Sequence, residues 1–140
     1  MSLEHRAWIE ALADSLTECA DAYRDRLQLG IRQGELDQDH ARVCFDDEML
    51  LRERASGLYA DAASLIIQEI DAGHSELIRL LKQASERLRA VQRVVDIGSL
   101  IGDLLTLATG VAAANPGSVI VALGQIRSQL ADLSTTNQSA

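Results

Sequence analysis

One pair of residues in this sequence has the spacing of metal ligands, His40 and Cys44. They lie four residues apart, so on a helix they share one face. Imidazole and thiolate both bind zinc, but a structural zinc site needs four ligands, and Cys19 is the only credible third one. We therefore expect a surface histidine and a packed core cysteine, with no metal site and no cofactor.

Two D-x-x-H segments, Asp37 to His40 and Asp71 to His74, come nearest to the ligand pattern of a di-metal site in a four-helix core. They stand at opposite ends of one expected helix, roughly 50 Å apart at the helical rise, and cannot share a site. We interpret both as helix-terminal caps. The acids at 46–48 are adjacent in sequence and point in different directions on a helix, so we expect a solvated acidic face there.

Sequence motifs for enzyme chemistry are absent. There is no phosphate-binding loop, no dinucleotide fingerprint and no H-E-x-x-H segment. The segment Gly98–Gly102 has two glycines but not the arrangement of a nucleophile elbow. A Ser-His-Asp or Cys-His constellation can be assembled from distant residues, and the sequence leaves that open. We expect that the protein is not an enzyme.

Asp96 and Asp103 are the charged residues of an otherwise apolar stretch. They are one heptad apart and so lie on nearly the same face of a helix. A carboxylate in such a place must find water or a hydrogen-bond donor. We expect this face to be turned to solvent. The alternative is a polar contact inside the protein, with Arg24, Arg26 or Arg42 as the partner.

Charge is unevenly distributed along the chain. The net charge is −8, with 17 acids against 7 Lys and Arg in residues 1–76 and 4 acids against 6 Lys and Arg in residues 77–140. A nucleic-acid binder needs a basic face that neutralises phosphates. The best candidate is interleaved with acids, and we interpret it as solvated helix surface; its members are Arg79, Lys82, Arg87, Arg89 and Arg93. We therefore expect no nucleic-acid partner, whereas the acidic half could receive a basic protein.

The start of the chain and its cysteines indicate a reducing environment. Glu4, Arg6 and Glu10 interrupt any apolar run that could form a secretory signal. The default is then a cytoplasmic protein whose cysteines, Cys19 and Cys44, are free thiols. Folding the first two helices against each other about residue 32 brings these cysteines opposite one another. We predict that their sulfur atoms lie within about one helical turn.

Apolar residues recur at steps of three and four and predict four helices. Acids crowd the start of the second helix, where the helix dipole favours negative charge. The third has the most regular heptad pattern and becomes apolar almost all round from Val94, which requires protein or lipid on every side. Asn115 and Pro116 separate it from the fourth. The first helix covers residues 3–28, the second runs from 37 or 39 to 70, the third from 74 or 75 to about 112, and the fourth covers 119–133. A polar tail at 134–140 is expected to fray.

These lengths and short connections predict an all-α fold. With 47% apolar residues and one proline, the chain can fill a core with helices, and no segment shows the alternation of a strand. Short connections make successive helices antiparallel. We expect one domain over residues 1–140, an elongated antiparallel helical bundle of three long helices plus one shorter C-terminal helix.

The predicted lengths leave one end of this bundle, residues 64–82, built from only two helices. This end carries more Leu and Ile than one mutual seam can bury, and exposed apolar clusters usually mark a contact surface. We predict a homodimer in which two such ends form a second four-helix layer. The predicted interface residues are Leu65, Ile66, Ile67, Ile70, Leu77, Ile78, Leu80 and Leu81.

The favoured function is a non-enzymatic protein–protein interaction bundle that self-associates, of adaptor, chaperone-like or immunity type. The alternative is a membrane-active helical protein, pore-forming or holin-like, that inserts the apolar segment 94–126. Residues 104–126 carry no charged side chain, and a run of this length spans a bilayer. The break at Asn115–Gly117 falls in the middle of the run, where it is costly in lipid and argues against insertion.

Overall fold

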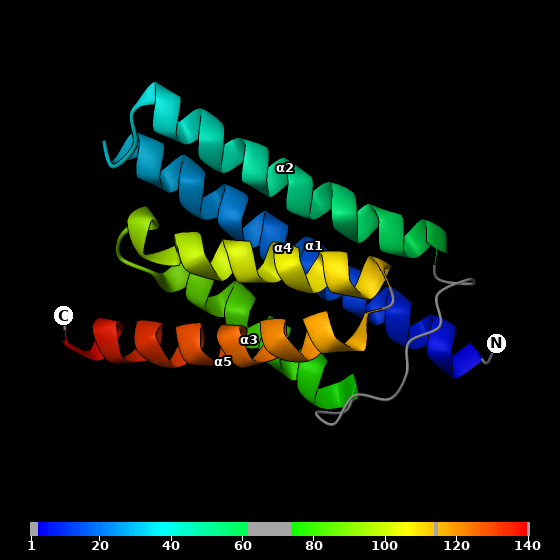
Figure 1. The fold of residues 1–140 in the computed structure, drawn as a ribbon. Coiled ribbons are helices and arrows are strands. Elements are labelled where there is room, and N and C mark those ends of the chain that lie inside the picture. The colour runs from blue at the N-terminus through cyan, green and yellow to red at the C-terminus, as the bar shows by residue number, and fades with distance from the viewer. Residues whose placement is uncertain (1–2, 62–73, 114, 140) are drawn as a thin grey trace.

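The computed structural model describes residues 3–61, 74–113 and 115–139, and in these ranges the protein is an all-α bundle, as predicted. Five α-helices and one short 3-10 helix follow one another along the described chain (Figure 1). They are α1 (Leu3–Arg32), α2 (Gln38–Asp61), α3 (His74–Ala90), the 3-10 helix η1 (Val94–Ile97), α4 (Gly98–Ala112) and α5 (Pro116–Ser139).

The five α-helices close into a ring around one apolar core (Figure 1). α1 packs against α2 and α3, α4 packs against α2 and α5, and α3 packs against α5, so each helix has two principal neighbours. Every helix contributes fully buried aliphatic residues, for example Leu16, Leu51, Leu81, Leu104 and Ile126. Burying one such side chain contributes about 1.5–3 kcal/mol, so the core dominates the stability of the fold.

The turn between α1 and α2 follows its sequence signals. α1 continues to Arg32 rather than ending at residue 28, and Gly34 then takes a left-handed φ of 77°, which glycine adopts without steric cost. Asp37 caps α2, because its Oδ1 accepts the backbone N–H of His40 at 2.8 Å. The predicted cap at Asp37 is therefore confirmed, whereas Asp71 lies outside the described residues.

The register of the α1–α2 hairpin differs from the predicted one. Asp21 pairs with Arg52 at 2.8 Å, and the hydroxyl of Tyr59 donates a hydrogen bond to Asp14. Both contacts are centred between residues 36 and 37, not at residue 32. The difference arises because α1 is longer than its apolar pattern indicates, which moves the turn along the chain.

The two cysteines are free, and their thiols face different neighbours. The Cys19 thiol donates to the carbonyl of Leu81 on α3 at 3.5 Å, whereas Cys44 contacts Tyr23. The register centred between residues 36 and 37 places Cys44 opposite residue 29, ten residues or roughly 15 Å along α1 from Cys19. The predicted proximity of the two sulfur atoms depended on a turn at residue 32 and is not supported by this register. Burial raises the pKa of Cys19 to about 12, which keeps this thiol a neutral packing group.

The main difference from the predicted fold lies in the third helix, which is not continuous. α3 ends at Ala90, and the chain turns back through η1 before α4 begins at Gly98. α4 therefore lies beside α2 and α5 instead of extending α3 (Figure 1). The predicted elongated bundle with a long third helix is wrong in this respect, because the stretch 91–97 forms a corner at the end of the molecule that also holds the α1–α2 turn.

Arg26 of α1 and Glu35 of the α1–α2 turn hold this corner, and we call the pair the corner clamp. The side chain of Arg26 is 2% exposed; its Nε donates to the Val91 carbonyl at 2.9 Å and its Nη2 to the Gln92 carbonyl at 2.7 Å. Glu35 accepts from Nη2 at 2.8 and 3.0 Å and from the backbone N–H of Val94 at 3.0 Å. The clamp thus satisfies backbone groups that the break in the helix leaves without helical partners.

Close packing and ionisation complete the clamp. A Cβ at Gly30 would lie 2.9 Å from Cγ2 of Val94, so a larger residue there would push the corner away from α1. Partial burial raises the pKa of Glu35, but hydrogen bonds from the Val94 N–H and from Arg26 outweigh this and lower the pKa below its ordinary value. Glu35 is therefore ionised at neutral pH and remains a charged partner of Arg26.

The connection between α4 and α5 also follows its sequence signals. Asn115 Oδ1 accepts the backbone N–H of Ser118 at 3.2 Å, and Pro116 occupies the first position of α5, where its missing N–H is not needed. Gly110 brings the two helices close, because a Cβ there would lie 3.2 Å from Cβ of Ser118 and 3.2 Å from Cγ2 of Val119. α5 continues to Ser139, so the tail predicted to fray extends the helix instead.

Candidate functional site

Part of the predicted interface lies inside the core of the chain itself. Leu77, Leu80 and Leu81 are buried, and Ile78 is half-buried against the same core. They are covered because α3 packs between α1 and α5. The α3 half of the predicted interface is therefore no free surface, and the dimer stays a prediction. The other predicted residues lie outside the described ranges: Leu65, Ile66, Ile67 and Ile70.

A cavity of about 580 Å³ opens where the α1–α2 turn meets the corner, and its walls include His40, Cys44 and Tyr23. His40 Nδ1 contacts Asp37 Oδ1 at 2.8 Å, and Cys44 contacts Tyr23. The third ligand considered for zinc, Cys19, is turned toward α3. In the described part of the chain, no group of three or more His, Cys, Asp or Glu is placed to hold a metal ion.

The same cavity is lined by a histidine and a cysteine, residue types used in nucleophilic catalysis, but these two side chains contact other residues and not each other. The imidazole of His40 is occupied at Nδ1 by Asp37, while the thiol of Cys44 interacts with the hydroxyl of Tyr23. Burial and the contact with Cys44 raise the pKa of Tyr23. These groups form two separate pairs, whereas a catalytic thiol requires a base in direct contact with it.

The basic residues of the second half are spread over different surroundings. Arg79 and Arg87 line a groove of about 630 Å³ between α3 and α5, together with Arg127. Arg127 donates to Glu76 of α3 at 2.8 Å, and Glu76 also lies 3.9 Å from Arg79. A phosphate-binding face needs cations that converge without intervening acids. The groove mixes both signs, which fits the predicted solvated helix surface.

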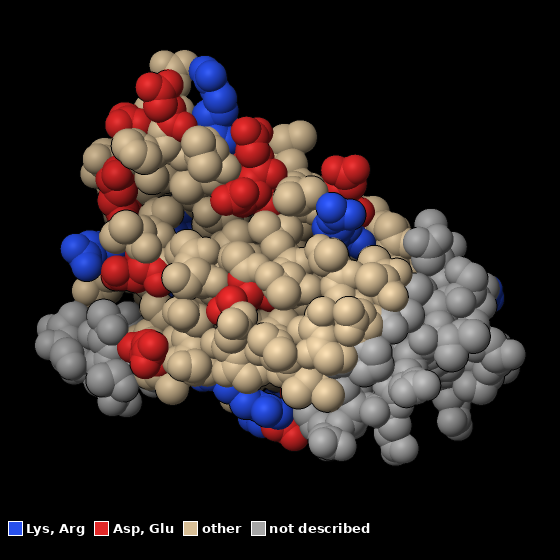
Figure 2. All heavy atoms as spheres, in the orientation of Figure 1, with Lys and Arg blue, Asp and Glu red and all other residues tan. Residues whose placement is uncertain are grey.

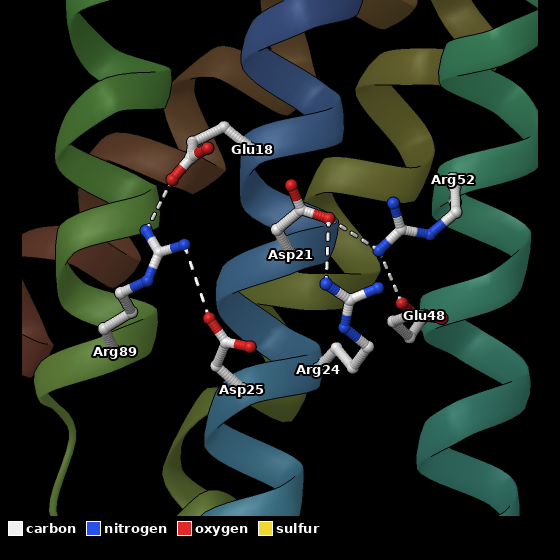
Figure 3. A network of polar contacts seen from close by, with 7 residues as sticks. All are labelled: Glu18, Asp21, Arg24, Asp25, Glu48, Arg52 and Arg89. Carbon is white, nitrogen blue, oxygen red and sulfur yellow. Dashed lines mark hydrogen bonds and ion pairs between the residues drawn. The ribbon is translucent and has the colours of Figure 1, made fainter.

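Acidic residues of α1 pair with arginines on both neighbouring helices (Figure 3). On the α3 side, Glu18 accepts from Arg89 at 2.6 Å. On the α2 side, Arg52 lies 2.8 Å from Asp21 and 2.7 Å from Glu48. The side chain of Glu48, which interrupts the apolar seam of α2, is 5% exposed and is satisfied by Arg52. The acidic half therefore uses part of its charge within the chain, which leaves less of it for a basic partner.

Asp96 and Asp103 have different surroundings. Asp96 lies in η1 and pairs with Arg93 at 3.3 Å. Asp103 is half-buried on α4, and burial raises its pKa above the ordinary value of an aspartate. Arg26, considered above as an internal partner for these residues, belongs to the corner clamp instead.

Replacing Asp103 with asparagine should raise the free energy of unfolding at neutral pH by about 0.5–1 kcal/mol, because the amide is not penalised for losing water as a carboxylate is. The pKa of Asp103 is higher in the folded than in the unfolded protein, so wild-type stability falls as the pH rises between those two values. Urea unfolding of wild type and variant should therefore diverge above this window and converge below it. Asp96→Asn, which loses a contact with Arg93, should gain nothing and serves as the control.

A broad surface almost without charge covers α4 and the first half of α5, with the half-buried Asp103 of α4 as its one acid, and we call it the uncharged face. Residues 104–126 contain no charged side chain. Figure 2 shows a wide tan area over these helices, with one acidic group inside it and the other acidic and basic side chains gathered around it. Its exposed members include Gly98, Gly102, Thr106, Thr109 and Ala112 of α4 and Gly117, Ile120, Val121 and Gly124 of α5.

The uncharged face contains features that the single chain leaves unused. Val95 at its edge is 76% exposed, and Ile120 and Val121 are 50% and 58% exposed. A Cβ at Gly98 or Gly102 would meet open space, so no contact described within the chain requires glycine there. Exposed aliphatic side chains beside glycines on a neutral surface are typical of a contact surface between proteins.

One described stretch is long and apolar enough to cross a membrane by length and composition, Val94–Ala112. Half of it is buried within the protein. The buried half holds the large aliphatic residues of α4, such as Leu100, Leu104 and Leu107, whereas the exposed half is mostly Gly, Ser and Thr. This distribution is typical of a core helix, which directs its most apolar side toward other helices.

No protein-family model, no curated protein and no solved structure matches this chain. The features from which a function can be inferred are therefore its surface and fold. They define an all-α bundle with an uncharged face over α4 and α5 and a corner clamp between α1 and the α3–α4 corner.

Proposed function

We propose that this protein is a non-enzymatic interaction bundle that self-associates, and that two copies meet through the uncharged face. One observation carries the proposal: exposed aliphatic side chains and glycines with open space above them lie together on a surface whose one acid is the half-buried Asp103. Helices can approach closely over glycine, and aliphatic side chains beside it then lose their contact with water.

The rest of the surface supports a second copy as the partner. α1, α2 and α3 present many acidic and basic side chains, several of them joined in ion pairs (Figure 3). A partner for the uncharged face must itself lack charge, because burying an unpaired charge is costly. In the described part of the chain, the uncharged face itself has that property apart from the half-buried Asp103. A two-fold axis places this surface against its own copy.

The proposal is tested by placing charge on the uncharged face. In the double variant Ile120→Lys and Val121→Lys, two exposed aliphatic positions of α5 become cationic and should repel their copies across the two-fold axis. The dimer dissociation constant measured by sedimentation equilibrium should rise by about 100-fold or more. Circular dichroism should show unchanged helicity, because both side chains are at least half exposed.

The matched control is Val43→Lys with Met49→Lys, which places the same two charges at 61% and 64% exposed positions of α2, outside the uncharged face. This variant should dimerise like the wild type. A wild-type protein that stays monomeric at high micromolar concentration would sink the proposal. A control that dissociates as readily as the double variant would show that net charge, not the uncharged face, governs association.

Membrane insertion of segment 94–126 stays a prediction. Two features weigh in favour of the interaction bundle instead. The corner at 91–97 ends α3 before the apolar stretch, and the large side chains of α4 are already occupied by the core. The outward Gly, Ser and Thr residues would offer lipid little apolar surface.

A further inference from the structure

The corner between α3 and α4 is imposed on a sequence that favours a continuous helix. Its stretch 91–97 contains neither glycine nor proline, the residues that usually end helices. The heptad seam of α3 continues through it, with Leu88, Val91, Val95 and Gly98 at steps of three and four. Local sequence and tertiary structure therefore disagree at the corner, and the corner persists because contacts from elsewhere hold it.

Those contacts come from the corner clamp. Arg26 donates hydrogen bonds to the carbonyls of Val91 and Gln92, and Glu35 accepts one from the N–H of Val94. In a straight helix the carbonyls of Val91 and Gln92 would instead accept from the N–H groups four residues later, and the N–H of Val94 would donate to the carbonyl of Ala90. Two conformations of the segment thus satisfy its backbone, one with the clamp and one without it.

Straightening the corner would move α4 and α5 as one unit. These two helices pack closely on each other at Gly110 and touch the remainder of the chain through α2 and α3. A single helix running from α3 into α4 would carry this α4–α5 hairpin away from its own α2 and α3. This movement exposes the surfaces of α2 and α3 that the hairpin covered. Because both chains are identical, the α4–α5 hairpin of a second copy fits the same surfaces.

We infer that two copies of this chain exchange their α4–α5 hairpins. Each half of the exchanged dimer contains α1, α2 and α3 of one copy and α4 and α5 of the other, so every helix regains the neighbours it has in the closed chain. The inference rests on the proposed self-association and specifies how the two copies interlock. The exchange also accounts for the heptad spacing that continues through the corner. Val95, Gly98 and Gly102 lie along the straightened helix, where the two straightened helices of the dimer cross.

An ion pair between α3 and α5 allows a direct test, because exchange turns it into a contact between chains. Arg127 donates to Glu76 at 2.8 Å, and both side chains are more than 40% exposed, so reversing either charge should leave the fold intact. Glu76→Arg places two arginines together, and Arg127→Glu places two glutamates together. In an exchanged heterodimer of the two variants, both halves again contain opposite charges.

The two variants are refolded together from urea at high micromolar concentration, and native mass spectrometry separates the three dimers by mass. Exchange predicts that the heterodimer exceeds either homodimer by about tenfold, because two repulsive contacts become attractive ones. Dimers in the statistical ratio would overturn the exchange and leave the proposed self-association standing. Monomers alone would overturn both.

A second test acts on the corner without touching any charge. Gln92 has an exposed side chain and contributes only its carbonyl to the clamp. Alanine at this position favours a continuous helix and glycine disfavours it. The exchanged dimer contains two such helices, so this difference in helix propensity counts twice. Gln92→Ala should therefore dimerise about 30-fold more tightly than Gln92→Gly in sedimentation equilibrium. Equal dissociation constants for Gln92→Ala and Gln92→Gly would overturn the exchange. If the double variant Ile120→Lys and Val121→Lys associates like the wild type, the uncharged face is not the contact surface, whatever the Gln92 variants show.

Discussion

Replacing Arg26 with alanine should lower the free energy of unfolding by about 3–4 kcal/mol. The guanidinium is almost fully buried and bonds to two backbone carbonyls and to Glu35. Its removal leaves the carbonyls of Val91 and Gln92 without a donor and Glu35 without its charged partner. Urea unfolding followed by circular dichroism at low protein concentration measures the loss in the closed chain.

Arg24→Ala is the matched control for this prediction. Arg24 lies on the same helix, is 44% exposed and pairs with Asp21 at 3.5 Å, so its removal should change stability by less than about 0.5 kcal/mol. Arg26→Met keeps most of the apolar stem and should still lose most of the stability, since the hydrogen bonds carry the effect. Similar losses for Arg24→Ala and Arg26→Ala would contradict the role assigned to the corner clamp.

The second large effect is expected at Gly110, where Gly110→Leu should cost about 2–3 kcal/mol. A Cβ at this position meets Cβ of Ser118 and Cγ2 of Val119 at 3.2 Å and the backbone nitrogen of Val119 at 3.3 Å. A longer side chain has to push α5 away from α4 or leave its preferred rotamer. The loss should be visible as a lower midpoint in thermal unfolding.

Gly102→Leu on the same helix is the matched control, because a Cβ there meets open space. Leucine has the higher helix propensity, so the closed chain should gain about 0.5–1 kcal/mol. Measurement at low concentration separates this gain from any change in self-association, since Gly102 belongs to the uncharged face. Equal destabilisation by both substitutions would show that α4 tolerates no side chain at either position.

Local signals in the sequence predicted the helices and their caps well. Asp37 and Asn115 cap the helices that follow them, as their residue types indicate, and Pro116 begins a helix as proline often does. These features depend on hydrogen bonds within a few residues. Spacing and residue type predict such hydrogen bonds because donor and acceptor are close in the chain.

The corner was missed because its cause is distant in sequence. Heptad spacing from Leu88 to Gly98 is uninterrupted, and only contacts from Arg26 and Glu35 decide that the helix stops. One signal for this contact was present. Arg26 occupies the next place in the buried seam of α1 after Tyr23, and a charge at a core position indicates a specific internal partner.

The predicted interface depended on this same missed corner. With a straight third helix, the Leu and Ile residues near 77–81 stand beyond the reach of the first helix, whereas the corner returns α3 to a place between α1 and α5. The uncharged face could be seen in sequence as the run 104–126 without charge. Which of its residues point outward could not be predicted, because that depends on which helices surround α4.

The sequence separations within the corner clamp favour one order of folding during synthesis. Arg26 and Glu35 are nine residues apart, so their pair can assemble as soon as α1 and its turn have left the ribosome. The segment they bend is synthesised about 65 residues later and meets a template that already exists. A circularly permuted chain that starts at α3 would reverse this order. Its α3 and α4 would be made before their template, with time to form the straight helix that their own sequence favours.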